Sequence, residues 1–222
     1  MSELRFLGHA AFELRLDGKV ILFDPWTTGN PQSPLASADD IEAADIILVS
    51  HDHSDHGFDD AVRIAKRTGA TVVAVAELAN RFRDEGIARV VSGNIGGTVG
   101  VSGIRITFVQ AVHSAGAGVP CGFVVRSPNL GLYFAGDTAL FGDMSFLADE
   151  KIDVAIPPIG GTFTMDIRAA AKSAERIRPR TVVPMHYGTF PDIVADTDEF
   201  TRLVGNKART EILSPGAVLS LR

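Results

Sequence analysis

Three histidines and two aspartates fall within six consecutive residues of this chain, where residues 51–56 read His-Asp-His-Ser-Asp-His. The cluster directly follows the apolar run at residues 45–49. His51 and His53 are two positions apart, and side chains at that spacing share a face when the backbone is extended. Imidazole nitrogen and carboxylate oxygen are ligands that zinc, iron and manganese accept. We therefore predict a metal site here and not a solvated polar loop.

Three further candidate ligands each follow a predicted strand. They are His113, Asp137 and His186. Taken singly, each has an ordinary structural interpretation, since a histidine can cap a strand and an aspartate after glycine can form a turn. Taken with residues 51–56, they supply a third nitrogen for each of two ions and a carboxylate to bridge them. Loops at strand ends are also where a rigid scaffold presents functional groups.

The elements that must position these residues alternate between strands and helices. Periodicity predicts helices at residues 58–68, 77–85, 143–148, 166–177 and 197–204. It predicts strands at 4–7, 11–16, 19–23, 45–50, 71–75, 87–91, 104–112, 122–126, 131–135, 152–156, 181–183, 210–213 and 217–221. The glycine-rich stretch at 93–103 is predicted to break the pattern. The two halves look similar, which suits two packed sheets with helices outside.

Composition bounds the class of protein. The chain has 222 residues, 45% apolar and 22% charged, which predicts one globular domain over residues 1–222. The net charge of −6 makes nucleic acid an unlikely main partner. The single cysteine, Cys121, suits a reducing compartment. We see no secretory signal and no apolar run long enough to span a bilayer, so we expect a cytoplasmic protein without a membrane partner.

The candidate ligands together resemble the complete ligand signature of the metallo-β-lactamase superfamily. Shorter segments, namely Gly8-His9-Ala10, 159–165 and 185–191, are similar to a branch of small, mostly uncharacterised metal-dependent hydrolases related to ascorbate-6-phosphate lactonase. The resemblance covers essentially the whole chain. It implies an α/β (α+β) fold, a four-layer αββα sandwich of two mixed β-sheets with helices on the outer faces.

The resemblance also implies a binuclear hydrolase. Its cofactors would be two divalent metal ions, with zinc favoured and manganese, iron or nickel as alternatives that the same donors accept. A metal-bridging hydroxide would attack a small-molecule lactone, ester, amide or phosphoester. The implied ligands are His51, His53 and His113 for one ion, and Asp55, His56 and His186 for the other, with Asp137 bridging.

For three further residues the sequence leaves two roles open. Asp24 resembles the superfamily's outer carboxylate that orients a ligand histidine, but it could equally cap the turn before Pro25. His9 is expected to be catalytic as a substrate contact or proton donor, the alternative being a buried structural histidine. Asp55 is a ligand that could also move a proton.

Three residues are expected to shape the substrate pocket, namely Thr164, Met165 and Tyr187. Met165 could equally be core packing, as could the neighbouring Phe163.

Two other functions share this ligand set. One is a metal-dependent nuclease or phosphodiesterase of the tRNA-processing type, which the acidic balance disfavours. The other is an iron-dependent redox protein on the same fold. A non-catalytic metal-binding module would require a missing ligand. We expect a small-molecule substrate as the partner, and a homo-oligomer is compatible with the sequence.

Overall fold

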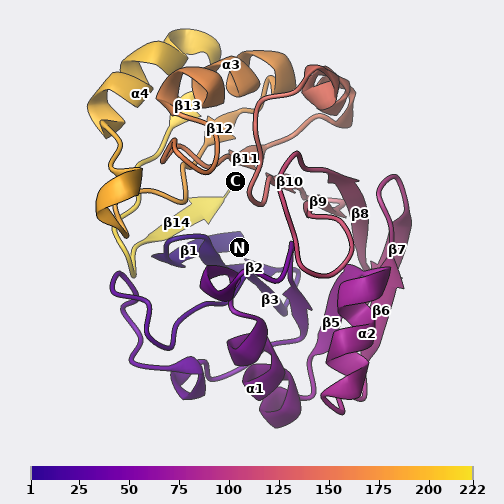
Figure 1. Ribbon diagram of the computed structural model, residues 1–222. Coiled ribbons are helices and arrows are strands. Elements are labelled where there is room, and N and C mark those ends of the chain that lie inside the picture. The colour runs from indigo at the N-terminus through magenta and orange to yellow at the C-terminus, as the bar shows by residue number, and fades with distance from the viewer. Residues whose placement is uncertain (1, 222) are drawn as a thin grey trace.

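Two β-sheets pack face to face at the centre of the protein, seen here in a computed structural model that describes residues 2–221 (Figure 1). Each sheet has seven strands, in the orders β14-β1-β2-β3-β4-β5-β6 and β13-β12-β11-β10-β9-β8-β7. The first sheet contains β1 (Ser2–Gly8), β2 (Ala11–Leu16), β3 (Lys19–Phe23), β4 (Ile46–Leu48), β5 (Thr71–Val75), β6 (Val90–Gly93) and β14 (Val218–Leu221). The second contains β7 (Thr98–Val101), β8 (Ile104–Gln110), β9 (Cys121–Ser127), β10 (Leu130–Phe134), β11 (Val154–Ile156), β12 (Thr181–Val182) and β13 (Arg209–Thr210).

Helices cover the outer faces of both sheets. Helices α1 (Phe58–Thr68) and α2 (Ala76–Asp84) lie outside the first sheet, and α3 (Ile167–Ile177) and α4 (Thr197–Val204) lie outside the second (Figure 1). Short 3-10 helices add η1 (Ala38–Asp40), η2 (Ser54–His56), η3 (Gly142–Glu150), η4 (Pro191–Ile193) and η5 (Gly205–Lys207). The layer order is helix, sheet, sheet, helix, and the predicted αββα sandwich is confirmed.

Aromatic side chains hold the two sheets together. Phe23 of β3 and Phe134 of β10 lie with ring centroids 4.9 Å apart, and Phe12 of β2 lies 6.4 Å from Phe134. All three are fully buried. Offset and edge-on aromatic pairs at such distances add to the free energy gained from burying apolar surface. The sheets therefore keep a fixed separation directly beneath the strand ends that carry the candidate ligands.

Parallel pairing brings those strand ends to one edge. Strands β3, β4, β5 and β6 are mutually parallel in the first sheet, and β10, β11, β12 and β13 are parallel in the second. Because parallel strands end at the same edge of a sheet, the segments after β3, β4, β10 and β12 must meet there. This topology places Asp24, residues 51–56, Asp137 and His186 on one side of the molecule.

Most elements agree with the sequence prediction, and two regions differ in the type of element. Helices at 58–68 and 197–204 are confirmed at the predicted bounds. The stretch at 93–103 does not simply break the pattern, because it contains β7, whose pairing with β8 outweighs the weak strand propensity of its glycines. Residues 143–148 belong to a 3-10 helix, in which buried Met144 and Leu147 are three apart, as three residues per turn require.

Two strands are also shorter than predicted or shifted along the chain. The strand predicted at 87–91 lies at β6, and of the strand predicted at 210–213 only β13 forms. Among residues 2–221, no helix is both long enough and apolar enough to cross a bilayer.

Two glycines at the ends of α1 test how tightly the ligand segment is packed. Gly57 and Gly69 both have φ of +72°. A Cβ at Gly57 would lie 2.4 Å from the backbone nitrogen of Trp26, whereas a Cβ at Gly69 would meet no atom within 4 Å. Both substitutions carry the left-handed backbone penalty, but only one forces backbone apart.

We predict that Gly69→Ala lowers the unfolding free energy by about 1–2 kcal/mol. Gly57→Ala should cost about 1–3 kcal/mol more and weaken metal binding, because it displaces the segment that ends at His56. Urea denaturation and zinc titration of both variants measure this. Equal losses of stability in the two variants would show that the contact with Trp26 carries no packing constraint.

Candidate metal centre

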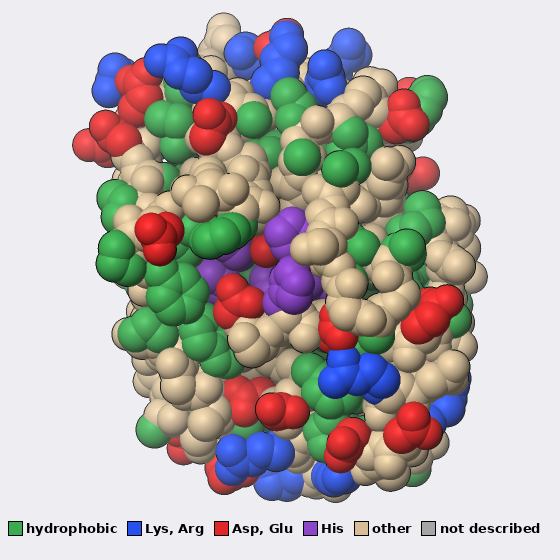
Figure 2. Space-filling model, viewed as in Figure 1, with side chains coloured by type: hydrophobic (Ala, Val, Ile, Leu, Met, Phe, Trp, Pro, Cys, Tyr) green, Lys and Arg blue, Asp and Glu red, His purple; other side chains and the backbone are tan. Residues whose placement is uncertain are grey.

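All six histidines of the sequence lie at this one edge of the sandwich. In the space-filling view, histidine side chains show at the centre of one face, with acidic and hydrophobic side chains around them (Figure 2). They come from both sheets and from segments far apart in the chain. The predicted ligands are His51, His53, Asp55, His56, His113, Asp137 and His186, and all of them meet here.

The first cluster consists of His51, His53 and His113. One ring nitrogen of each lies within 4.8 Å of the others. The closest pair is His51 Nε2 and His53 Nδ1, at 3.0 Å. The predicted strand at 45–50 ends early, at Leu48, but residues 51 and 53 still direct their rings into the same space. These three nitrogens form the set predicted for one ion.

The second cluster consists of Asp55, His56 and His186, joined by His9. One ligand atom of each of these four residues lies within 4.8 Å of the others. The sequence predicted the first three as ligands, and the structure adds the fourth to the same group. His9 is fully buried, with Nε2 3.2 Å from Asp55 Oδ2. Its predicted action on substrate would therefore pass through Asp55, which lines the cavity beside it.

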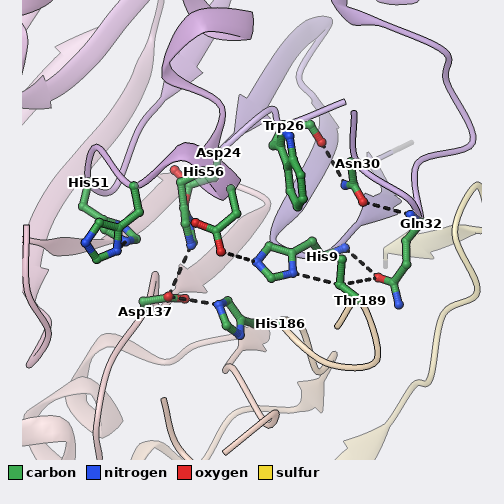
Figure 3. A network of polar contacts seen from close by, with 12 residues as sticks. His9, Asp24, Trp26, Asn30, Gln32, His51, His56, Asp137, His186 and Thr189 are labelled. Atoms are coloured by element: carbon green, nitrogen blue, oxygen red, sulfur yellow. Dashed lines mark hydrogen bonds and ion pairs between the residues drawn. The ribbon is translucent and has the colours of Figure 1, made fainter. Parts of the chain in front are cut away.

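Asp137 lies between the two clusters. Its Oδ2 is 3.3 Å from His56 Nε2 and 3.1 Å from His186 Nε2 (Figure 3). The same oxygen is 3.6 Å from His113 Nε2 in the other cluster. Burial alone would raise the pKa of Asp137, but the charges of His56 and His186 outweigh burial and hold that pKa well below its usual range. The carboxylate is therefore ionised, and one of its oxygens lies near histidines of both clusters.

The buried carboxylate of Asp24 fixes the orientation of His56. Asp24 Oδ2 is 2.7 Å from His56 Nδ1, and Ser50 donates to the same carboxylate from its backbone N–H at 2.7 Å and from its hydroxyl at 2.6 Å. A carboxylate only accepts, so His56 carries a proton on Nδ1 and directs Nε2 toward Asp137. Burial raises the pKa of Asp24, and the adjacent His56 and Ser50 oppose that rise. The predicted orienting contact of Asp24 is present.

Ser50 determines which ring nitrogen of His51 carries the proton. Because the Ser50 hydroxyl donates its only proton to Asp24, its oxygen must accept from His51 Nδ1, 2.9 Å away. His51 Nε2 then keeps a free lone pair facing His53. Sequence reasoning missed Ser50, although its position directly before the histidine cluster was the available signal. Outer contacts of this kind set which nitrogen of a histidine binds a metal.

Buried polar atoms without partners test whether the site suits a cation. Within residues 2–221, His9 Nε2, His56 Nε2, Asp137 Oδ1 and His186 Nδ1 are buried and make no hydrogen bond. Unpaired buried polar atoms are costly, and here all four belong to the second cluster or to Asp137 beside it. Nitrogen and carboxylate donors are also the set that divalent transition metals accept. The residues present therefore fit a metal centre.

The pKa values of the buried histidines also bear on metal binding. Burial lowers the pKa of His51 to about 2 and that of His9 to about 4, so both rings are neutral at pH 7 and able to ligate. For His56, burial would lower the pKa, but Asp137 and Asp24 outweigh it and raise the pKa well above its usual value. A metal must displace the proton on His56, so metal binding weakens as the pH falls.

Asp52 is the one member of the 51–56 cluster that turns away. Its carboxylate pairs with Arg81 of α2 and accepts from the backbone N–H of Gly116 at 2.7 Å. It therefore ties the segment after His113 to the first sheet. Three other polar residues at the site have positive φ, namely His9 at 58°, Asp24 at 39° and His186 at 55°. Strained backbone of this kind persists where surrounding contacts over-determine it.

A cavity of about 290 Å³ opens onto both clusters. Its walls are His53, Asp55, His113, Ser114, Asp137, Phe163 and His186. Phe163 is 60% exposed, so it forms a wall of the mouth and is not core packing. A larger cavity of about 610 Å³ lies at the opposite ends of the strands, against Asp153 and Arg180, away from the candidate ligands.

The three residues expected to shape the pocket are not among the residues that line this cavity. Met165 is buried in the core and is 2% exposed. Thr164 directs a buried hydroxyl that makes no hydrogen bond, and Tyr187 is half-buried with its carbonyl bound to Gln32. Their part in substrate binding stays a prediction. Phe163 and Ser114 form the observed wall beside the ligands.

Replacing Asp24 tests the orienting contact. Asp24→Asn keeps the shape of the side chain but presents an N–H₂ donor where two donors now converge. We predict that zinc affinity falls by about 10–100-fold, measured by competition with a chelator.

The matched control is Asp60→Asn, since Asp60 is also a buried carboxylate and accepts from the backbone N–H groups of Thr27 and Thr28, both at 2.7 Å. It should lower the unfolding free energy by about 1–3 kcal/mol and leave zinc affinity unchanged. If Asp24→Asn bound zinc as the unmodified protein does, the orienting role of Asp24 would be wrong.

Comparison with known proteins agrees with this geometry. The family model described as the β-lactamase superfamily domain matches residues 3–186. A UPF0173 metal-dependent hydrolase of Thermofilum pendens is 47% identical over 97% of each chain, and one of Caldivirga maquilingensis is 48% identical over 100% of this chain and 99% of its own. The solved structure of Igni18, a metallo hydrolase of Ignicoccus hospitalis, superposes with a TM-score of 0.92 at 35% identity, covering 100% of this chain and 99% of that one.

Proposed function

We infer the function of this chain from the premise that it belongs to the β-lactamase superfamily and, within it, to the UPF0173 metal-dependent hydrolases. We propose that residues 1–222 act as one binuclear hydrolase domain on a small-molecule lactone, ester, amide or phosphoester. The observation that carries the proposal is the position of Asp137, whose one carboxylate oxygen lies within 3.6 Å of histidines from both clusters.

Two divalent ions are assigned to the two clusters. His51, His53 and His113 would hold one ion, Asp55, His56 and His186 would hold the other, and Asp137 lies where it could contact both. The chemistry that such a pair supplies when bound is Lewis acidity toward a carbonyl or phosphoryl oxygen, together with a hydroxide nucleophile available at neutral pH.

The protein's own groups then position and exchange protons. Asp24 and Ser50 hold the rings of His56 and His51 so that each Nε2 faces the reacting space. Asp55 is partly exposed on the cavity wall, with 28% of its side chain accessible, so one of its carboxylate oxygens can accept a proton from the attacking water and return it to the leaving group. His9 is packed directly behind Asp55, with its Nε2 3.2 Å from Asp55 Oδ2.

The cavity supports a small substrate. Its volume of about 290 Å³ is at the lower end for ligand sites, and its walls combine metal ligands with one serine and one phenylalanine. Phe163 at the mouth provides an apolar face and limits the entry of water. These walls suit a compact molecule whose polar group meets the ligand cluster. A small-molecule partner therefore remains our proposal.

Removal of one ligand from the first cluster tests the function. We predict that His53→Ala loses about one equivalent of bound metal and loses hydrolysis of its best substrate by at least about 100-fold, because a ligand to one of two cooperating ions is gone. Metal content by elemental analysis and rates across a panel of lactones, thioesters, amides and phosphodiesters measure both effects. The panel is run with defined zinc and manganese loading.

The control is Glu175→Gln, an exposed residue of α3 remote from the site, which should behave as the unmodified protein. Full activity in folded His53→Ala would contradict the proposal. Elemental analysis of protein purified without added metal also addresses metal identity. We expect zinc, and iron as the resident metal would favour the redox alternative instead.

A further inference from the structure

His9 is the one histidine at the site that the seven-ligand set does not use, and its contacts determine where its proton lies. Gln32 and Thr189 fix the proton of His9 in the way that Ser50 fixes the proton of His51 (Figure 3). Two backbone groups, the N–H of His9 and the carbonyl of Tyr187, have unchangeable donor and acceptor roles and orient Gln32.

The first step fixes the side-chain amide of Gln32. Its Oε1 lies 3.0 Å from the backbone N–H of His9, and its Nε2 lies 3.1 Å from the backbone carbonyl of Tyr187. A backbone N–H can only donate and a carbonyl can only accept. Turning the amide over would place donor against donor and acceptor against acceptor. Gln32 Oε1 is therefore the acceptor on this side.

The second step fixes the hydroxyl of Thr189. Its Oγ1 lies 2.9 Å from Gln32 Oε1. Because that oxygen can only accept, the Thr189 hydroxyl donates its single proton in this hydrogen bond. The same Oγ1 lies 2.9 Å from His9 Nδ1. With its proton already used, the threonine oxygen can only accept here, and His9 must donate from Nδ1.

The third step concerns the opposite nitrogen of the ring. A neutral imidazole, the form that binds metals, carries one proton, and in His9 that proton is on Nδ1. His9 Nε2 therefore presents a lone pair, buried and 3.2 Å from Asp55 Oδ2, and two acceptors at that distance are favourable only with a cation between them. It faces Asp55, His56 and His186, whose ligand atoms lie within 4.8 Å of it and of one another.

The ring has little freedom to turn elsewhere. Its centroid lies 5.3 Å from that of Trp26 and 4.2 Å from that of His186, and the backbone carbonyl of His9 accepts from the N–H of His186 at 2.8 Å. Donors at tetrahedral angles on one zinc ion lie about 3.4 Å apart, so atoms within 4.8 Å of one another need to approach by at most about 1.4 Å around an ion.

We propose that His9 Nε2 is an additional ligand of the second metal ion, selected by the Gln32–Thr189 relay. The inference rests on the proposed binuclear function. The second ion then has protein donors from His9, Asp55, His56, His186 and Asp137, whereas the first has His51, His53, His113 and Asp137. The second ion would therefore be held by more protein donors than the first.

Cadmium-113 NMR of the full chain, labelled with nitrogen-15 in its histidines, tests the bond directly. We expect scalar coupling between cadmium and His9 Nε2, and an Nδ1–H signal protected from exchange by Thr189. The Nδ1–H should already be present in the metal-free protein. Loss of the His9 signals in His9→Asn assigns them. Absence of coupling to His9 in protein that binds two cadmium ions would overturn the inference.

Zinc titration supplies an independent readout. His9→Asn suits it because asparagine tolerates the left-handed backbone at this position, where φ is 58°, and keeps a donor toward Thr189 while removing Nε2. We expect one zinc to bind as in the unmodified protein and the second about 10–100-fold more weakly. Thr189→Val, which frees the proton of His9, should weaken the same zinc and abolish the protected Nδ1–H signal.

The outcomes separate the two proposals. If the unmodified chain fails to bind a second ion, the binuclear function itself fails. If it binds two ions and His9→Asn binds both with unchanged affinity, only the role of His9 fails. Unchanged affinity together with an unchanged Nδ1–H signal in Thr189→Val would contradict the relay.

Discussion

Histidine nitrogens and carboxylate oxygens held close together at one edge of the sandwich are the constraint on which this structure depends. His51 Nε2 and His53 Nδ1 are 3.0 Å apart, and the proton of His51 is held on its other nitrogen by Ser50. At that distance His53 Nδ1 donates to His51 Nε2, and a cation that binds both nitrogens must replace this hydrogen bond and the proton in it. The fold holds the rings in place through Asp24, a carboxylate that is itself fully buried. Stability and metal binding are therefore coupled in this protein.

The convergence of the ligands follows from elementary rules of chain topology. Each predicted ligand follows a buried strand, and parallel pairing of β3 with β4 and of β10 with β11 and β12 places the strand ends at one edge. Local periodicity and residue types with few other uses could therefore predict two packed sheets and the meeting of the seven candidate ligands, whereas the four-layer sandwich followed from the family resemblance. It predicted β7 poorly, since pairing with β8 is a long-range contact that outweighs the propensity of its glycines.

The contacts that orient the ligands lie beyond what the sequence indicates. Ser50 contacts Asp24 across 26 positions, and Thr189 contacts His9 across 180. Serine, threonine and glutamine are common on loops, so nothing in their local pattern marks them. The same holds for Phe163, whose exposure at the cavity mouth depends on the path of the loop between β11 and α3. Asp52 is the opposite case, because its place among the histidines suggests a ligand and its side chain in fact holds Arg81 and Gly116.

Anomalous diffraction from crystals of the metal-loaded protein, recorded on both sides of the zinc absorption edge, tests the central claim most directly. The account predicts two peaks about 3.5–4 Å apart, one among His51, His53 and His113, the other beside His56 and His186, with an oxygen of Asp137 between them. A single peak, or peaks away from Asp137 in fully loaded crystals, would contradict it.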